Sequence, residues 1–203
     1  MIHLAILLAA LPFIASADEM VFDRYVVYEP VTLGSQCLDV RRIDVANMTF
    51  RARDPESSRQ FEFRFRHGQT TRGDSPDVPS INWTTAVTRD RLMTATDGHL
   101  LRVVSISDVH DSSMTREYVS VLSCSDGTAH EVLQAGGEGL FLDGRTPSGD
   151  TIRLRWAVWR KGDCHACPSR ERIQDLSWRP AFGRFAIVRD VERDFKPRSD
   201  PER

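Results

Sequence analysis

The strict alternation of apolar and charged residues is what most constrains the fold of this chain. In residues 61–66, three phenylalanines alternate with a glutamate and two arginines. Successive side chains of a β-strand point to opposite faces, so this spacing gathers the three rings on one face and the three charges on the other. Residues 152–158 repeat the pattern, with Arg153 and Arg155 between apolar neighbours. Both segments therefore predict half-buried β-strands.

Further segments rich in β-branched and aromatic residues are also expected to be strands. They are residues 20–28, 47–50, 100–106, 118–122, 129–133, 172–178 and 184–188. Ser-Asp-Gly at 125–127 can reverse the chain because glycine tolerates a positive φ, and the glycine-rich run at 136–139 is also expected to be a turn. Residues 83–96 are the one segment that permits a helix, although their apolar positions form no single stripe. The chain is therefore predicted to be mainly β with little helix, an antiparallel sandwich or a barrel-like fold.

The first seventeen residues read as a secretory signal. An apolar run at 4–14 precedes Ala-Ser-Ala at 15–17, a small-residue sequence of the kind that signal peptidase cuts. The run has about 11 residues, whereas a helix needs about 20 to cross a bilayer. We expect residues 1–17 to be removed and the protein to be exported, to a periplasm or to the cell exterior. An uncleaved anchor is the alternative, because the positive charge before the run is weak.

The rest of the chain is long enough for one domain with a substantial core, and residues 18–193 are expected to form a single β-rich domain. Residues 67–80 are dense in Gly, Asp, Thr, Pro and Ser, which predicts an exposed loop. Residues 194–203 are charged and contain two prolines, so they are expected to be a solvated tail. No later segment of the sequence is apolar enough for a membrane span.

Charge and composition bear on the partners. The net charge of −2 provides no global attraction to nucleic acid or to acidic membranes, so we expect no nucleic-acid partner. Lysine stands only at positions 161 and 196, and arginine supplies the other basic residues. This bias is typical of a GC-rich genome and, together with the signal, favours a bacterial source. The expected partner is an unknown protein or envelope component.

Two glycosylation sequons are present, Asn47-Met48-Thr49 and Asn82-Trp83-Thr84. Both asparagines would carry glycans if the source were a eukaryote or a virus of one. In a bacterium the two sequons are silent, and a tripeptide this loose arises readily by chance.

The four cysteines of an exported chain predict disulfides. The four cysteines can pair in three ways. Cys164 and Cys167 are close in sequence while Cys37 and Cys124 are distant, so one local bond and one long-range bond are the economical choice. In the chain-entropy model a bond from Cys37 to Cys124 would add on the order of 4 kcal/mol.

The pair Cys164 and Cys167 is also the one credible reactive site, with His165 between the two sulfurs. Thioredoxin-like proteins place such a motif at the start of a helix, whose dipole lowers the pKa of the first thiol. Here a predicted strand follows the motif instead. We interpret the pair as a structural clip in a hairpin connection, with a redox pair and a metal site as alternatives. Zinc would need a fourth ligand beyond these three residues.

Other motifs are incomplete. Asp108-Val109-His110 looks like the first metal motif of calcineurin-like metallophosphoesterases, but their remaining metal motifs are missing from the sequence. Arg-Gly-Asp-Ser at 72–75 matches an integrin-binding tetrapeptide of low specificity. His67, His99 and His130 are scattered and are expected to be surface or turn residues. No nucleophile elbow or phosphate loop is present, so no catalytic residue, metal or cofactor is predicted.

Residues 152–188 resemble a segment found in other proteins. Their Arg-rich strand, Gly162-Asp163, Cys167-Pro168-Ser169 and the later Leu-Ser-Trp at 176–178 resemble a terminal β-hairpin of uncharacterised bacterial exported proteins, which often show Cys-Cys-Pro-Ser before an Arg-Trp strand. In this chain the first cysteine is displaced to 164. The resemblance implies an exported hairpin module clipped by cysteine and implies no activity.

Together these observations predict an exported, disulfide-stabilised β protein that acts as a non-catalytic binding or envelope-associated module. The alternative is a periplasmic thiol-disulfide oxidoreductase, with Cys164 as the attacking thiol and Cys167 as its partner. Trp159 is a candidate contact residue if it is exposed, because tryptophan is enriched at interface hot spots.

Overall fold

The computed structural model describes residues 24–27, 31–53, 60–72, 83–109, 115–142, 149–164 and 167–195. Antiparallel strands dominate them, which confirms the mainly β prediction. The strands are β1 (Arg24–Val27), β2 (Val31–Gln36), β3 (Thr49–Arg53), β4 (Gln60–Arg64), β5 (Gln69–Arg72), β6 (Trp83–Thr94), β7 (Leu100–Val109), β8 (Thr115–Ser125), β9 (Thr128–Glu138), β10 (Leu140–Leu142), β11 (Thr151–Val158), β12 (Arg170–Arg179) and β13 (Arg184–Asp194). Two short 3-10 helices, η1 (Val40–Arg42) and η2 (Pro180–Phe182), complete the described elements. The predicted signal lies outside the described residues.

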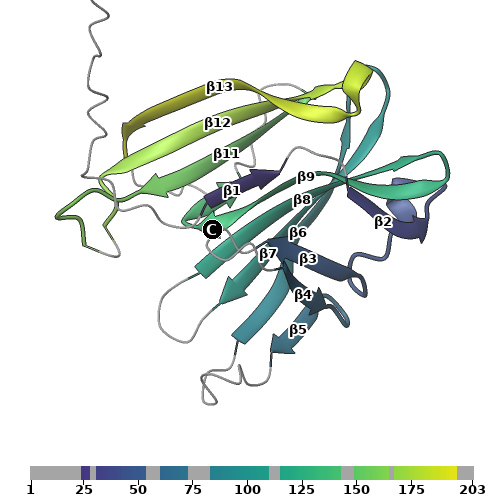
Figure 1. Cartoon of the computed structure of the whole chain (residues 1–203), viewed down its shortest axis with the longest axis horizontal. Coiled ribbons are helices and arrows are strands. Elements are labelled where there is room, and N and C mark those ends of the chain that lie inside the picture. Colours follow the sequence, from purple (N-terminus) through teal and green to yellow (C-terminus); the bar gives the residue numbers. More distant parts are fainter. Residues whose placement is uncertain are drawn as a thin grey trace, which may run out of the picture.

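The strands form three sheets (Figure 1). The central sheet has the order β1-β9-β8-β7-β6-β5, and β2 pairs with β9 further along the same edge as β1. A four-stranded sheet has the order β10-β11-β12-β13, and β3 and β4 form a separate hairpin. Strands β5 to β9 and β10 to β13 each run as a meander of sequence neighbours, so most pairings close over short connections.

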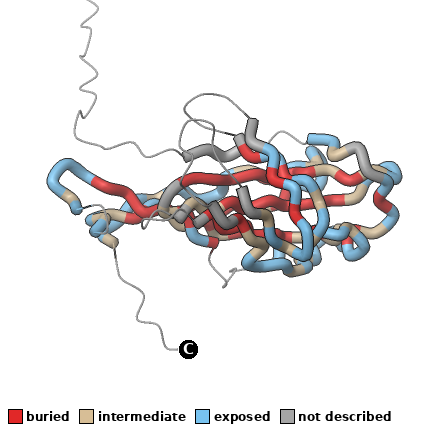
Figure 2. The backbone as a smooth tube through the Cα atoms, turned by 90° about the horizontal axis from the view of Figure 1, so that it is seen from below, coloured by how far each residue is buried: buried red, intermediate tan, exposed pale blue. Residues whose placement is uncertain are grey.

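Two hydrophobic cores lie on opposite faces of the central sheet. The first core packs the four-stranded sheet against β7, β8 and β9, around the fully buried Trp156. The second core packs the β3–β4 hairpin and η1 against the other face, around Phe50 and Phe63. Figure 2 shows these buried stretches as red segments in stacked layers. The arrangement is a sandwich with a smaller third layer.

The middle strands of the central sheet therefore have no solvent face. On β7, Leu101 and Val103 belong to the first core, whereas Val104 and Ile106 belong to the second. Successive side chains alternate between the faces of a sheet, so a strand covered on both sides reads as a nearly continuous apolar run. This explains why residues 100–106 are apolar at adjacent positions.

The structure decides one segment that the sequence left open and changes the bounds of two others. Residues 83–94 form strand β6, not a helix, because β-branched residues fill its first half and both of its edges pair, with β5 and with β7. The expected loop at 67–80 contains β5, and its residues 73–80 lie outside the described chain. The expected tail at 194–203 begins too early, since β13 extends to Asp194 and the amide of Phe195 bonds to the Ser169 carbonyl at 2.9 Å.

The two predicted glycine turns had different outcomes. The turn after β8 is present, and Asp126 and Gly127 have positive φ angles of 51° and 74°, as a tight hairpin turn requires. At 136–139 the first two glycines instead belong to β9, and the turn is confined to Gly139. A Cβ on Gly139 would lie 2.7 Å from both Ala157 and Trp159, so this position requires glycine.

Candidate functional site

The Cys37–Cys124 disulfide connects the chain just after β2 to the end of β8, with 5.5 Å between the two Cα atoms. Cys37 is 4% exposed, and its amide donates to the carbonyl of Gly127 at 2.8 Å. Cys124 packs against the second core. The bond thereby anchors the segment that enters η1 to the central sheet, in the long-range pairing expected from the sequence.

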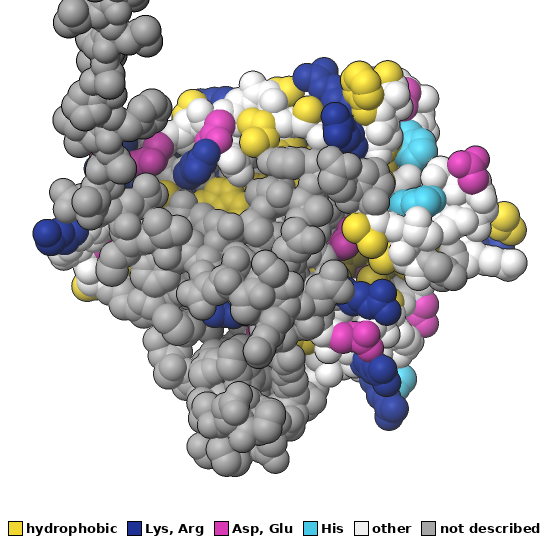
Figure 3. Space-filling model, in the orientation of Figure 1, with side chains coloured by type: hydrophobic (Ala, Val, Ile, Leu, Met, Phe, Trp, Pro, Cys, Tyr) yellow, Lys and Arg dark blue, Asp and Glu magenta, His cyan; other side chains and the backbone are white. Residues whose placement is uncertain are grey.

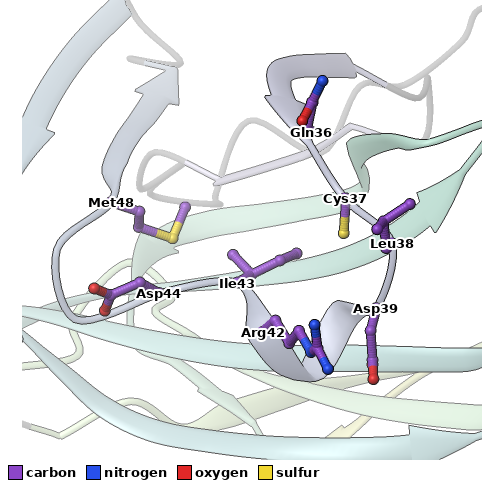
Figure 4. A pocket seen from close by; sticks show the side chains of 8 residues that line it. All are labelled: Gln36, Cys37, Leu38, Asp39, Arg42, Ile43, Asp44 and Met48. Carbon is purple, nitrogen blue, oxygen red and sulfur yellow. The ribbon is translucent and has the colours of Figure 1, made fainter.

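An open cleft of about 410 Å³ lies beside this disulfide (Figure 4). It is lined by Gln36, Cys37, Leu38, Asp39, Arg42, Ile43, Asp44 and Met48. Ile43 and Met48 form an apolar side that continues into the second core. Leu38 is 90% exposed at the rim, so a large apolar side chain is presented to solvent next to a rigid attachment point.

The charged side chains around the cleft differ in whether another residue pairs with them. The side chain and backbone amide of Arg41 both donate to the Asp39 carboxylate at 2.9 Å, which lowers the pKa of Asp39 and neutralises its charge. The Asp44 carboxylate accepts a hydrogen bond of 2.8 Å from the side-chain Nδ2 atom of Asn47. Arg42 is exposed and forms no ion pair with another residue that the structure describes. Its guanidinium is therefore the cation available to a ligand in the cleft.

Arg102 holds the cleft in shape. From β7, its Nη1 atom donates to the carbonyls of Val40 and Arg41 at 3.2 Å and also to that of Ile43. Its other nitrogens pair with the Asp90 carboxylate at 2.7 and 2.6 Å. Two of these carbonyls also accept backbone amides, that of Val40 from Ile43 and that of Ile43 from Val45, and Arg102 ties all three carbonyls to β7. The cleft is thus formed before any ligand arrives.

The Cys164–Cys167 disulfide lies at the tip of the β11–β12 hairpin, with 4.9 Å between the Cα atoms, in the local pairing expected from the sequence. Both cysteines are exposed. Asp163 accepts hydrogen bonds from the amides of Arg160 and Ser169 at 2.7 and 2.9 Å, and these bonds lower its pKa. The motif lies between β11 and β12, and the described residues on either side of it form no helix whose dipole could act on a sulfur.

The remaining motif residues do not form a shared site. Asn47 is exposed in the turn before β3, with its side-chain oxygen accepting the amide of His67 at 3.0 Å, whereas Asn82 lies outside the described residues. Asp108 is buried and accepts a 2.7 Å hydrogen bond from Thr85. His110, His165 and residues 73–75 also lie outside the described chain. Within the described ranges no group of His, Cys, Asp and Glu is arranged to hold a metal ion.

His99 does not follow the expectation of a simple surface or turn residue. Its ring stacks on Trp178 with 5.3 Å between centroids, and its Nε2 atom lies 2.8 Å from the hydroxyl of Ser123. Ser123 is only 3% exposed and His99 is half-buried, so these contacts pack the start of β7 against Trp178. Trp159 is 5% exposed and is likewise part of the packing, against Gly139.

Glu131 is a buried acid that sequence reasoning missed. Burial raises its pKa to about 7, although Ser120 and Gln134 both donate hydrogen bonds to its carboxylate. The Gln134 amide also donates to the Arg51 carbonyl of the β3–β4 hairpin at 2.7 Å. This network connects the central sheet to its third layer.

Comparisons with protein-family models, with curated proteins and with solved structures found no match to this chain. Across the described residues, no helix has the length and apolar character to cross a membrane. The function is therefore argued from the geometry of the chain's own sites.

Proposed function

We propose that this protein is an exported, disulfide-stabilised binding module without catalysis of its own, and that it takes its ligand in the cleft beside the Cys37–Cys124 disulfide. The observation that carries the proposal is the combination of an exposed apolar rim at Leu38 with an available cation at Arg42, on a segment that is fastened at both ends. A preformed site of this kind lowers the ordering cost of binding.

The cleft favours a small apolar group attached to a carboxylate. Leu38, Ile43 and Met48 offer apolar contact, while the guanidinium of Arg42 suits bidentate pairing with a carboxylate. The cleft contains no residue with the arrangement of a nucleophile and its base. Binding is thus better supported than a reaction at this site.

The test is a titration of the exported protein with N-acetyl-leucine, followed by ¹H–¹⁵N NMR. The expected result is a set of saturable shifts confined to residues 36–48, which Arg42→Gln abolishes and N-acetyl-leucinamide does not reproduce. Arg66→Gln, an exposed arginine outside the cleft, is the matched control and should leave the shifts intact. Shifts scattered over the surface, or no shift at residues 36–48, would overturn the proposed cleft.

A thiol-disulfide oxidoreductase is the second candidate, and the exposure of both Cys164 and Cys167 favours it. An insulin-reduction assay in dithiothreitol distinguishes the two. We expect the exported protein and its Cys164→Ser/Cys167→Ser variant to give the same uncatalysed rate. A faster rate that the double variant loses would establish redox catalysis and contradict the non-catalytic proposal.

A further inference from the structure

The four-stranded sheet has one face on the first core and one face turned away from it. Leu154, Trp156, Leu176 and Phe185 point into that core. Their neighbours along β11, β12 and β13 therefore point outward, because side chains alternate between the faces of a sheet. This outward side is called the outer face below.

Two buried carboxylates organise the outer face. The Glu171 and Asp175 side chains, both on β12, are 1% and 8% exposed. Arg155 pairs with Glu171, with Nε at 2.7 Å, and Arg153 holds Asp175 through two nitrogens at 2.6 and 2.9 Å. The hydrogen bonds from Arg153 lower the pKa of Asp175. The two arginines of β11 thus already balance both acids.

Strand β13 adds a second arginine to each carboxylate. The Arg193 Nε atom lies 2.7 Å from Glu171, and the Arg189 Nη1 atom lies 3.8 Å from Asp175. Both β13 side chains are 50% exposed. Since each acid is already paired from β11, the charges of Arg189 and Arg193 are in surplus on this face.

A β-bulge aligns further arginines with these two. Val188 has no register partner, because Ile187 is opposite Leu176 while Arg189 is opposite Asp175. The extra residue reverses the alternation, so Arg184 lies on the same face as Arg189 despite the odd spacing.

The η2 turn carries exposed apolar surface beside arginines. Arg179 and Arg184 are register partners at the turn, and both are exposed. The Arg184 guanidinium lies over the ring of Phe182, 5.7 Å from its centroid, and Phe182 is 69% exposed. In Figure 3, basic and hydrophobic side chains lie together where Figure 1 places η2. Val188, on the bulge, is 49% exposed.

The outer face has a strong excess of positive charge. Among the described residues of β10 to β13 it holds six arginines and two carboxylates, in a chain whose net charge is −2. The exposed part, here named the basic ridge, consists of Arg179, Arg184, Arg189 and Arg193 with Phe182 and Val188. Along β13 it extends roughly 30 Å.

We propose that the basic ridge docks the protein on the anionic headgroup surface of a lipid bilayer. Guanidinium groups pair with phosphate in the bidentate manner, and each basic residue near an anionic leaflet strengthens attachment. Phe182 supplies the second element of peripheral binding, an apolar side chain at the tip of a turn that enters the headgroup region. A soluble polyanion would match the charges but would leave Phe182 and Val188 in water.

The experiment is co-sedimentation of the exported protein with vesicles of phosphatidylcholine alone and of phosphatidylcholine mixed with phosphatidylglycerol. We expect binding to the anionic vesicles and loss of that binding near 1 M salt, where the Debye length is about 3 Å. Arg179→Glu/Arg184→Glu should weaken binding at least about tenfold. Phe182→Ser should weaken it about threefold, because less apolar surface is inserted.

Arg64→Glu/Arg66→Glu is the matched control, since it makes the same change in net charge on the third layer and should leave binding unchanged. Circular dichroism and thermal unfolding of each variant confirm that the fold is kept. Equal binding to both kinds of vesicle, binding to neither, equal losses in the ridge and control variants, or binding to heparin without binding to vesicles would each overturn the proposal. The ridge and the Arg42 cleft are different surfaces, so the failure of either test leaves the other conclusion standing.

Discussion

The two disulfides of this chain lie in regions built in opposite ways. The Cys37–Cys124 bond spans 87 residues and joins the end of β2, where the chain leaves for η1, to β8 of the central sheet, beside a hydrophobic core. The Cys164–Cys167 bond spans three residues at the exposed end of one hairpin. The first bond constrains tertiary structure, whereas the second constrains a turn that β11 and β12 already close.

The surroundings of the bonds differ as well. Near the hairpin tip, ion pairs replace core packing: Arg170 pairs with Asp194 at 2.7 Å, and Arg160 pairs with Glu192 at the same distance. Around Cys37, apolar contacts and the partly buried hydrogen bonds of Arg102 hold the chain in place. The comparison teaches that an even cysteine count predicts bonds but does not predict what each bond stabilises.

The largest difference between the two regions is expected when the long-range bond is removed. Cys37→Ser/Cys124→Ser should lower the free energy of unfolding by about 4 to 5 kcal/mol, because the unfolded chain regains the entropy of an 87-residue loop. Urea unfolding monitored by tryptophan fluorescence measures the loss. A loss no greater than that of the hairpin double variant would show that the two bonds are equivalent.

Stability should depend on pH through Glu131 of β9, whose hydrogen-bond network reaches the third layer. The pKa of Glu131 is raised in the folded state from 4.5 to about 7, so the folded protein keeps a proton that the unfolded chain releases between these values. The contribution of Glu131 to stability is therefore full below about pH 4.5, and it falls by about 3 kcal/mol as the pH rises toward 7.

Glu131→Gln should remove that fall and leave a flatter profile. Urea unfolding from about pH 5 to about pH 8 provides the measurement. Asp163→Asn, at the hairpin tip, is the control and should not change the slope in this range, since the pKa of Asp163 is lowered. Parallel profiles for the wild type and Glu131→Gln would contradict the assignment.

A substitution of Arg102 tests the stability of the region around Cys37 without changing a cysteine. Arg102→Met removes a donor to two η1 carbonyls and to the carbonyl of Ile43, together with the partner of Asp90, and should destabilise the protein by about 2 kcal/mol. Hydrogen exchange should show faster opening of residues 37–48, with little change at the hairpin tip. Arg66→Met, on an exposed arginine, should cost no more than about 0.5 kcal/mol. Uniformly faster exchange over the whole chain would contradict a local role of Arg102 in holding residues 37–48.

The smallest effect is expected at the hairpin tip. The chain-entropy model allows about 2 kcal/mol for so short a loop, and the closed hairpin should reduce the loss in Cys164→Ser/Cys167→Ser to about 1 kcal/mol. The same urea unfolding measures it. A loss as large as that from Cys37→Ser/Cys124→Ser would mean that the tip is coupled to a core.

Much of the fold follows from local pattern. The alternation in residues 61–66 and 152–158 correctly predicts β4 and β11, because each strand has one apolar and one polar face. Strand β6 escaped prediction because Arg91 and Met93 suit a helix in isolation. Pairing on both sides, with β5 and β7, overrides that preference, and such pairing is not visible in the segment itself.

The candidate surfaces were much harder to predict. Leu38 and Arg42 come together through a turn, a short helix and a bond to a cysteine 87 residues away. The basic ridge is hidden by the near-neutral charge of the whole chain. It also depends on the bulge at Val188, since without it Arg184 and Arg189 would lie on opposite faces.

The order of the cysteines along the chain has a consequence for oxidative folding. The first cysteine bonds to the second and the third bonds to the fourth, so the two loops neither overlap nor nest. A polypeptide that enters an oxidising compartment with its N-terminus first presents Cys37 and Cys124 before any competing thiol arrives. An oxidant that joins cysteines simply in order of appearance would form both native bonds, and folding of this protein should proceed without a disulfide isomerase.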